Sequence, residues 1–158
     1  MNYDLEDFND DGLLLPGTFL TLVTFYIGRF LFFGPLSLLA SNRGFSGGGS
    51  LDLSFLTDVS PLAMFSSIPA AIVIYAMLAR SPASSAFIKT LWKWGKLELI
   101  VCLMIQMAIL VYEFDQSAID WPVQLAFGTI NVFFLLYLFS SSRPKDVFAQ
   151  FPGDDRPA

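Results

Sequence analysis

Four long apolar runs constrain this chain more than any other feature. They cover residues 18–40, 59–79, 97–115 and 121–141. A helix needs about 20 mostly apolar residues to cross the hydrocarbon core of a bilayer, so four crossings use roughly 80 residues. Because the chain has 158 residues, no remaining segment is long enough for a soluble domain with its own core. We therefore expect one transmembrane domain over 18–141 and two tails.

The residue pattern inside these runs favours helices over a transmembrane β-barrel. The segment Val101–Leu110 is apolar on all sides except at Gln106, whereas a barrel strand alternates apolar and polar residues. In hydrocarbon, only helices and closed barrels satisfy the hydrogen bonds of the backbone. The sequence thus predicts an all-α integral membrane protein, built as a bundle of four transmembrane helices. Pro69 lies at the middle of the second run and should kink that helix, because it removes one backbone hydrogen bond.

The basic residues predict the orientation of the chain in the membrane. Lysine and arginine are enriched in short cytoplasmic loops. One side of the predicted bundle carries Arg43 alone. The other side carries seven basic residues: Arg80, Lys89, Lys93, Lys96, Arg143, Lys145 and Arg156. This asymmetry puts the acidic N-terminal tail at 1–17, the loop at 80–96 and the polar C-terminal tail at 142–158 in the cytoplasm. We expect the C-terminal tail to be mobile.

The loop at 80–96 should contain a short amphipathic helix, over about residues 84–95, between the second and third spans. One face would carry apolar side chains, and another would carry lysines at positions i, i+4 and i+7. Such a helix lies flat in the membrane interface, with tryptophan at headgroup level and lysine toward anionic lipid. The residues expected to face lipid are Lys89, Lys93, Lys96, Trp92 and Trp94. A protein-docking role for this helix stays open as an alternative.

Three polar residues fall at one depth within the spans. Arg29 lies near the middle of the first span, Gln106 in the third and Asn131 in the fourth. An arginine at the bilayer centre costs about 2.5–3.5 kcal/mol on insertion scales, so it usually faces protein or water. Two interpretations stay open: amides that hold the guanidinium and join the helices, or a functional polar site at the midplane. No carboxylate lies at this depth in the sequence, which counts against a proton pump.

Small residues recur along the second span. Ala63, Ser67 and Ala71 are spaced four residues apart, which puts them on one face of a regular helix. Small residues at this spacing let helix backbones approach closely. We expect this face to pack inside the bundle, and a dimerisation face is the alternative.

Residues that the chain lacks argue against many enzyme classes. It has no histidine and a single cysteine, Cys102, in an apolar run. It therefore lacks the usual ligands of haem, zinc or an iron–sulfur cluster. The segment Gly44–Gly48 fits the G-x-S-x-G pattern, but that motif needs a histidine to take the serine proton. We expect no catalytic residue, no metal site and no cofactor.

A set of scattered residues carries a resemblance to a known family. The set comprises Tyr3, Asp4, Asp11, Gly12, Leu13, Arg29, Phe55, Asp58, Pro69, Arg80, Trp92 and Gly95. In this pattern the chain resembles the YfeZ-like family of uncharacterised proteobacterial inner-membrane proteins, over most of residues 3–140. The resemblance implies a multi-pass protein of the bacterial inner membrane. It implies no activity and transfers no catalytic residue.

These observations favour a non-enzymatic membrane protein that acts through partners, as an accessory factor, an assembly factor or a small subunit of a complex. The alternative is a small oligomeric transporter or channel that uses Arg29, Gln106 and Asn131, and a membrane enzyme comes third. As partners we expect the bilayer, with anionic lipid on its cytoplasmic face, and other membrane proteins or further copies of the chain. We expect no nucleic-acid partner.

Overall fold

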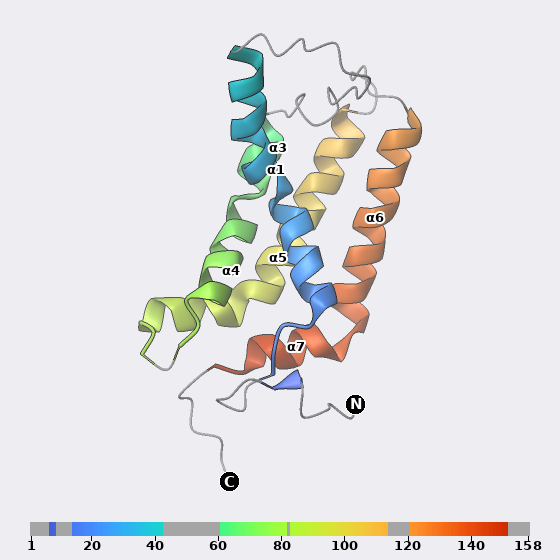
Figure 1. The fold of residues 1–158 in the computed structure, drawn as a ribbon. Coiled ribbons are helices and arrows are strands. Elements are labelled where there is room, and N and C mark those ends of the chain that lie inside the picture. Colours follow the sequence, from blue (N-terminus) through green and yellow to red (C-terminus); the bar gives the residue numbers. More distant parts are fainter. Residues whose placement is uncertain (1–6, 9–13, 43–60, 82, 114–120, 152–158) are drawn as a thin grey trace.

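The computed structural model describes residues 7–8, 14–42, 61–81, 83–113 and 121–151. Within these ranges the regular elements are helices, apart from one antiparallel bridge between Phe8 and Leu14, which confirms the all-α prediction. The helices are α1 (Thr18–Asn42), α3 (Pro61–Ser66), α4 (Ile68–Leu78), α5 (Ala86–Glu113), α6 (Trp121–Ser140) and α7 (Ser142–Ala149) (Figure 1). Most of the predicted N-terminal tail lies outside the described residues, as do Arg43, Arg156 and the segment at 44–48.

Three of the helices are long and apolar enough to cross a membrane, by their length and composition. The apolar segments are Thr18–Pro35 in α1, Ala86–Tyr112 in α5 and Trp121–Ser140 in α6. Large apolar side chains on these helices face outward, since Val111 is 70% exposed and Phe139 is 64% exposed. Contiguous apolar surface marks a membrane or partner contact rather than a surface in water. These helices indicate a membrane protein.

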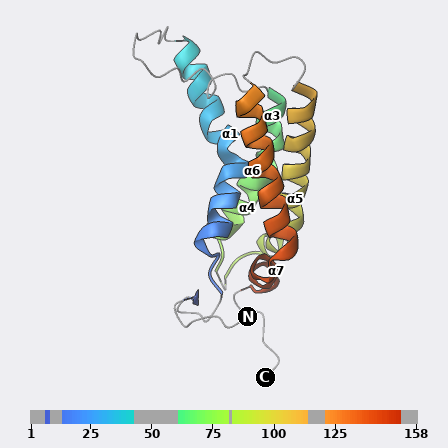
Figure 2. The same cartoon turned by 90° about the vertical axis from the view of Figure 1, so that its right-hand side faces the viewer.

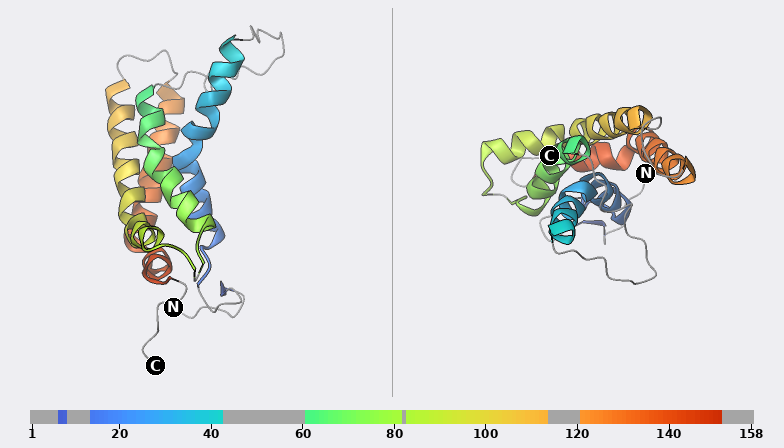
Figure 3. Two further views of the ribbon diagram at one scale, coloured as in Figure 1. Left: turned by 90° about the vertical axis from the view of Figure 1, so that its left-hand side faces the viewer. Right: turned by 90° about the horizontal axis from the view of Figure 1, so that it is seen from above.

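The second apolar run does not form one helix. It is divided into α3 and α4, and the helix breaks at Ser67 between them. The amide of Ser67 donates to the carbonyl of Met64 at 3.1 Å, three residues back instead of the four of an α-helix. Pro69 lies in the first turn of α4, where its missing N–H leaves no helical hydrogen bond unmade. The predicted kink is therefore a break just before the proline. The two pieces run end to end beside α1 and α5 (Figure 3).

α5 corrects the prediction of a separate interfacial helix followed by a third span. Its 28 residues form one continuous helix. The segment predicted as amphipathic is its first part, which runs across the bundle, whereas the remainder runs along it (Figures 1 and 3). No proline separates the two parts, so no residue removes a backbone donor and ends the helix between them.

α7 corrects the prediction of a mobile C-terminal tail. It lies across one end of the bundle (Figure 2) and buries Pro144, Val147 and Phe148. The ring of Phe148 packs on Gly95 of α5, where an added Cβ atom would lie only 2.5 Å from the ring. Glycine at this position thus allows α7 to approach α5 closely.

Aromatic side chains join α1 to α6. The ring of Phe19 lies 4.4 Å from that of Tyr137 and 5.8 Å from that of Phe134, measured between ring centroids. Tyr26, further along α1, lies 4.9 Å from Phe134. Edge-to-face pairs of this kind are worth about 0.5–1.5 kcal/mol beyond the area that they bury. They hold α6 against the part of α1 that precedes Arg29.

Candidate functional site

Arg29 meets a polar partner from another helix within the bundle. Its Nη1 donates a hydrogen bond to the carbonyl of Tyr26 at 2.8 Å and to Oε1 of Gln106 at 3.2 Å. The structure therefore brings together two of the three residues that the sequence assigns to one depth. One guanidinium links α1 to α5 in this way.

The same amide of Gln106 continues the network into the break between α3 and α4. Its Nε2 donates to the carbonyl of Ile27 at 2.9 Å and to Oγ of Ser67 at 3.4 Å. The hydroxyl of Ser67 donates to the same carbonyl at 2.8 Å. Both Gln106 and Ser67 are buried. We call Arg29, Gln106, Ser67 and the carbonyl of Ile27 the mid-span network, and it joins α1, α5 and the α3–α4 break.

Three aromatic rings surround the guanidinium of Arg29. Its central carbon lies 3.9 Å from the ring centroid of Tyr26, 4.1 Å from that of Phe30 and 5.3 Å from that of Phe127. A cation over an aromatic face gains about 0.5–2 kcal/mol, most where water is excluded. Phe127 belongs to α6, so this helix contacts Arg29 with a ring rather than with an amide.

Asn131 does not join the mid-span network. It is buried, with 1% exposure, and its Oδ1 has no hydrogen-bond partner among the described residues. The depth predicted for Asn131 from its sequence position says nothing about the rotation of α6 about its axis. Phe127, one turn earlier on α6, is the residue of that helix that faces the guanidinium.

A second polar cluster lies at the end of the bundle where α7 crosses it. Arg80, which follows α4, donates from Nη1 to the carbonyl of Leu14 at 3.3 Å and from Nη2 to the carbonyl of Gln150 at 2.8 Å. Its guanidinium also lies over the ring of Trp92, 4.7 Å from the centroid. Burial lowers the pKa of Arg80 from its usual value, and the two carbonyls and the ring replace part of the lost water. We call Leu14, Arg80, Trp92 and Gln150 the terminal cluster.

Trp92 does not face lipid, contrary to the prediction. It is 1% exposed, and its indole N–H donates to the carbonyls of Val147 at 3.1 Å and Gln150 at 3.0 Å. The indole thereby satisfies its single donor in the protein, and its ring packs 4.8 Å from that of Phe148. Trp94 is 55% exposed, as a lipid-facing residue would be. Lys93 is also exposed, whereas Lys89 and Lys96 are half-buried.

The terminal cluster joins the two terminal segments to each other. The amide of Leu14 donates to Oε1 of Gln150 at 3.1 Å. Asp7 and Arg143 form an ion pair at 2.5 Å, and the carbonyl of Asp7 accepts from the amide of Leu15. The sequence analysis missed this cluster, although a positively charged Arg80 and the indole donor of Trp92 both require partners if they are buried.

Both clusters fall within one family match. The chain matches, over residues 3–150, the family model described as "Protein of unknown function (DUF2919)". It belongs to the DUF2919 family. No curated protein and no solved structure matches the chain. The family description transfers no activity, so the function of the DUF2919 chain has to be argued from its own residues.

The small residues of the second run whose side chains are described differ in burial in the DUF2919 chain. Ser67 is fully buried in the mid-span network, whereas Ala71 lines an open apolar groove with Ile72 and Tyr75. The side chain of Ala63 lies outside the described part. Ala70, rather than Ala71, is fully buried in α4. The amide of Ala71 donates to the carbonyl of Ser67 at 3.2 Å, one regular helical turn, so the break interrupts the four-residue spacing between Ala63 and Ser67.

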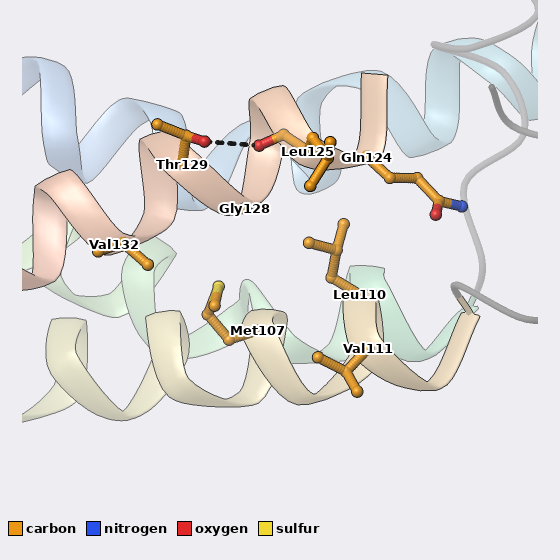
Figure 4. A pocket seen from close by; sticks show the side chains of 8 residues that line it. All are labelled: Met107, Leu110, Val111, Gln124, Leu125, Gly128, Thr129 and Val132. Carbon is orange, nitrogen blue, oxygen red and sulfur yellow. Dashed lines mark hydrogen bonds between the residues drawn. The ribbon is translucent and has the colours of Figure 1, made fainter. Parts of the chain in front are cut away.

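An apolar groove of about 560 Å³ runs between α5 and α6 of the DUF2919 chain (Figure 4). α5 lines it with Met107 and Leu110, and α6 lines it with Leu125 and Gly128. The hydroxyl of Thr129, at its edge, donates to the carbonyl of Leu125 within α6 at 2.8 Å. This surface suits hydrocarbon or an apolar helix rather than a polar substrate. Among the described residues, no group of three His, Cys, Asp or Glu side chains is placed to hold a metal ion.

Proposed function

We propose that the chain is a four-span protein of the bacterial inner membrane, with both ends in the cytoplasm. In this proposal it acts through membrane partners as an accessory factor, an assembly factor or a small subunit, and it catalyses no reaction. The proposal also keeps the YfeZ-like resemblance, which implies the same membrane. Each part is supported by a different feature of the described residues.

The broken pair of helices supports the fourth crossing. α3 and α4, with Ser67 between them, occupy Pro61–Leu78. At a rise of 1.5 Å per residue, these 18 residues give about 27 Å, close to the roughly 30 Å of a hydrocarbon core. Broken helices are tolerated at membrane depth where protein covers the freed backbone groups. Here Gln106 bonds the hydroxyl of Ser67 at the break, and both side chains donate to the carbonyl of Ile27 on α1.

The terminal cluster supports an even number of crossings. The amide of Leu14, before α1, bonds the side chain of Gln150, after α7. In this proposal both ends of the domain therefore lie on one side of the membrane, which three crossings would not allow. The described basic residues of the loop and the C-terminal segment on that side favour the cytoplasm. They are Arg80, Lys89, Lys93, Lys96, Arg143 and Lys145.

The mid-span network is the observation that carries the functional proposal. Arg29 and Gln106, two of the three polar side chains predicted at that depth, bond each other and the backbone. A transport path through Arg29 requires access for water, whereas Tyr26, Phe30 and Phe127 lie against its guanidinium. The network thus serves to join helices. What the chain offers to other molecules is its apolar exterior, including the α5–α6 groove, which is the surface that membrane partners use.

Substitution of Arg29 tests this proposal. In Arg29→Leu, both the buried charge and its desolvation cost disappear, so the protein should fold with nearly unchanged stability. In Arg29→Glu, a carboxylate would lie against Oε1 of Gln106 and the negative faces of the aromatic rings, which both repel it. This variant should fail to accumulate. Gel electrophoresis in mild detergent should show wild type and Arg29→Leu in the same complex, larger than a single chain. A wild-type chain that stays single, together with loss of a measured transport activity in well-folded Arg29→Leu, would favour the transporter instead.

A further inference from the structure

A pocket of about 320 Å³ lies between the first part of α5 and the end of α7. α5 contributes Lys89, Thr90 and Lys93 to its wall. Phe148 and Phe151, which are both buried, contribute aromatic surface. The pocket therefore combines two lysines and a threonine with an apolar wall.

The two helices that form this pocket share an unusual direction. The first part of α5 and all of α7 run across the bundle, side by side, at the same end (Figures 1 and 3). The apolar segment of α5 begins at Ala86, so Lys89 and Lys93 lie within about two turns of its start. Trp94 is 55% exposed next to them, and tryptophan favours the headgroup level. The pocket thus opens where lipid headgroups would lie.

The side chains of the pocket match one class of ligand. Lysine ammonium groups bind phosphate as point charges, and Lys89 and Lys93 are one helical turn apart on the same face. The ring of Phe151 lies 5.3 Å from Nζ of Lys89, so the charge and the apolar wall are adjacent. A ligand with a phosphate next to hydrocarbon would use both.

We propose that this pocket binds the headgroup of an anionic phospholipid, with the phosphate between Lys89 and Lys93 and the glycerol region against Phe148 and Phe151. The inference deepens the proposed function, since it rests on the basic end of the bundle facing the anionic leaflet. It names one bound lipid rather than a general attraction of basic residues to the membrane surface.

Native mass spectrometry of the full chain, released from detergent micelles, tests the proposal. The protein is mixed with phosphatidylglycerol or with phosphatidylcholine of the same acyl length. We expect one phosphatidylglycerol to be retained, in several-fold preference to phosphatidylcholine. The double substitution Lys89→Gln and Lys93→Gln should weaken this retention about 30-fold, because each basic group near an anionic surface contributes about 1 kcal/mol.

Two further variants separate the pocket from charge alone. The matched control Lys96→Gln with Lys145→Gln removes the same charge from residues that do not line the pocket, and it should retain the lipid within twofold. Ala149→Trp keeps every lysine but fills the pocket from an exposed position at the end of α7. It should lose the bound lipid while its melting temperature stays close to that of wild type.

Each remaining outcome would overturn the proposal. Equal retention of the two lipids, or equal loss in the two double variants, would show diffuse charge attraction. Retention in Ala149→Trp would show that the pocket is not the site. If millimolar inorganic phosphate displaced the bound phosphatidylglycerol as effectively as added lipid does, the pocket would be a site for free phosphate. Fractionation of the same variants distinguishes these results from failure of the proposed function, since a chain absent from the membrane would contradict both.

Discussion

The guanidinium of Arg80 lies over the indole ring of Trp92, and both side chains donate to the carbonyl oxygen of Gln150, at 2.8 Å and 3.0 Å. One backbone carbonyl therefore joins the residue after α4, the first part of α5 and the segment after α7. Because Arg80 also binds the carbonyl of Leu14, the segment before α1 is held at the same point. The cluster fixes one end of the bundle by hydrogen bonds to the carbonyls of Leu14 and Gln150, near the ion pair of Asp7 with Arg143.

Trp92→Phe tests the role of the indole donor. Phenylalanine keeps a ring against Phe148 and Arg80, but it leaves the carbonyl of Val147 without the indole N–H. We expect the protein to lose about 1–3 kcal/mol of stability, the cost of a buried polar group that loses a partner. Thermal unfolding in detergent measures the change. Trp94→Phe, at a residue that is 55% exposed, is the control and should stay within about 0.5 kcal/mol. Equal effects of the two substitutions would contradict the assignment.

Gly95→Ala tests the docking of α7 on α5. The added methyl group would lie 2.5 Å from Cε1 of Phe148, so the ring must move and α7 with it. Overpacking of this kind costs about 1–3 kcal/mol. Limited proteolysis should then cut α7 more readily than in wild type. Gly128→Ala is the matched control, because its methyl group meets only Cδ2 of Leu110 at 3.3 Å. Unchanged protection of α7 in Gly95→Ala would mean that this contact does not hold the helix.

Much of the fold could be predicted because it depends on local pattern. Long apolar runs with few charges mark α1, α5 and α6 whatever their neighbours are. α7 could not be predicted in this way. Few apolar side chains distinguish it within a polar tail. Phe148 is buried because Gly95 and Trp92 present a surface to it. Such a short helix owes its stability to tertiary contact rather than to its own sequence.

The candidate site could be predicted in depth but not in rotation. A fixed rise per residue puts Arg29, Gln106 and Asn131 at one level, and the bond between Arg29 and Gln106 is present. A helix that is apolar on all sides gives no signal for the direction in which one residue points. The sequence therefore favours Asn131 as the partner from α6, whereas in the structure that partner is the ring of Phe127. The prediction that Trp92 faces lipid fails for a related reason. An amphipathic pattern does not distinguish a lipid contact from a contact with another helix of the same chain, here α7.

Asn131→Leu tests whether the amide, whose oxygen has no partner among the described residues, is merely tolerated. Its Oδ1 has no partner among the described residues, so leucine should be neutral or raise the melting temperature by a few degrees. Gln106→Leu is the contrasting substitution at the same depth. It removes a partner of Arg29 and should lower stability by about 1–3 kcal/mol. Destabilisation of similar size at both positions would show that Asn131 has a role equal to that of Gln106.

The number of crossings and the side of the two ends are tested most directly by reporter fusions along the chain. A reporter that is active only in the cytoplasm should be active after Ala158 and near Ser84, because Leu14 and Gln150 meet at the end of the bundle that carries the basic loop. A reporter that is active only in the periplasm should be active near Gly48 and near Ser117. Periplasmic activity of the Ser84 fusion, or ends on opposite sides of the membrane, would contradict the four-span arrangement.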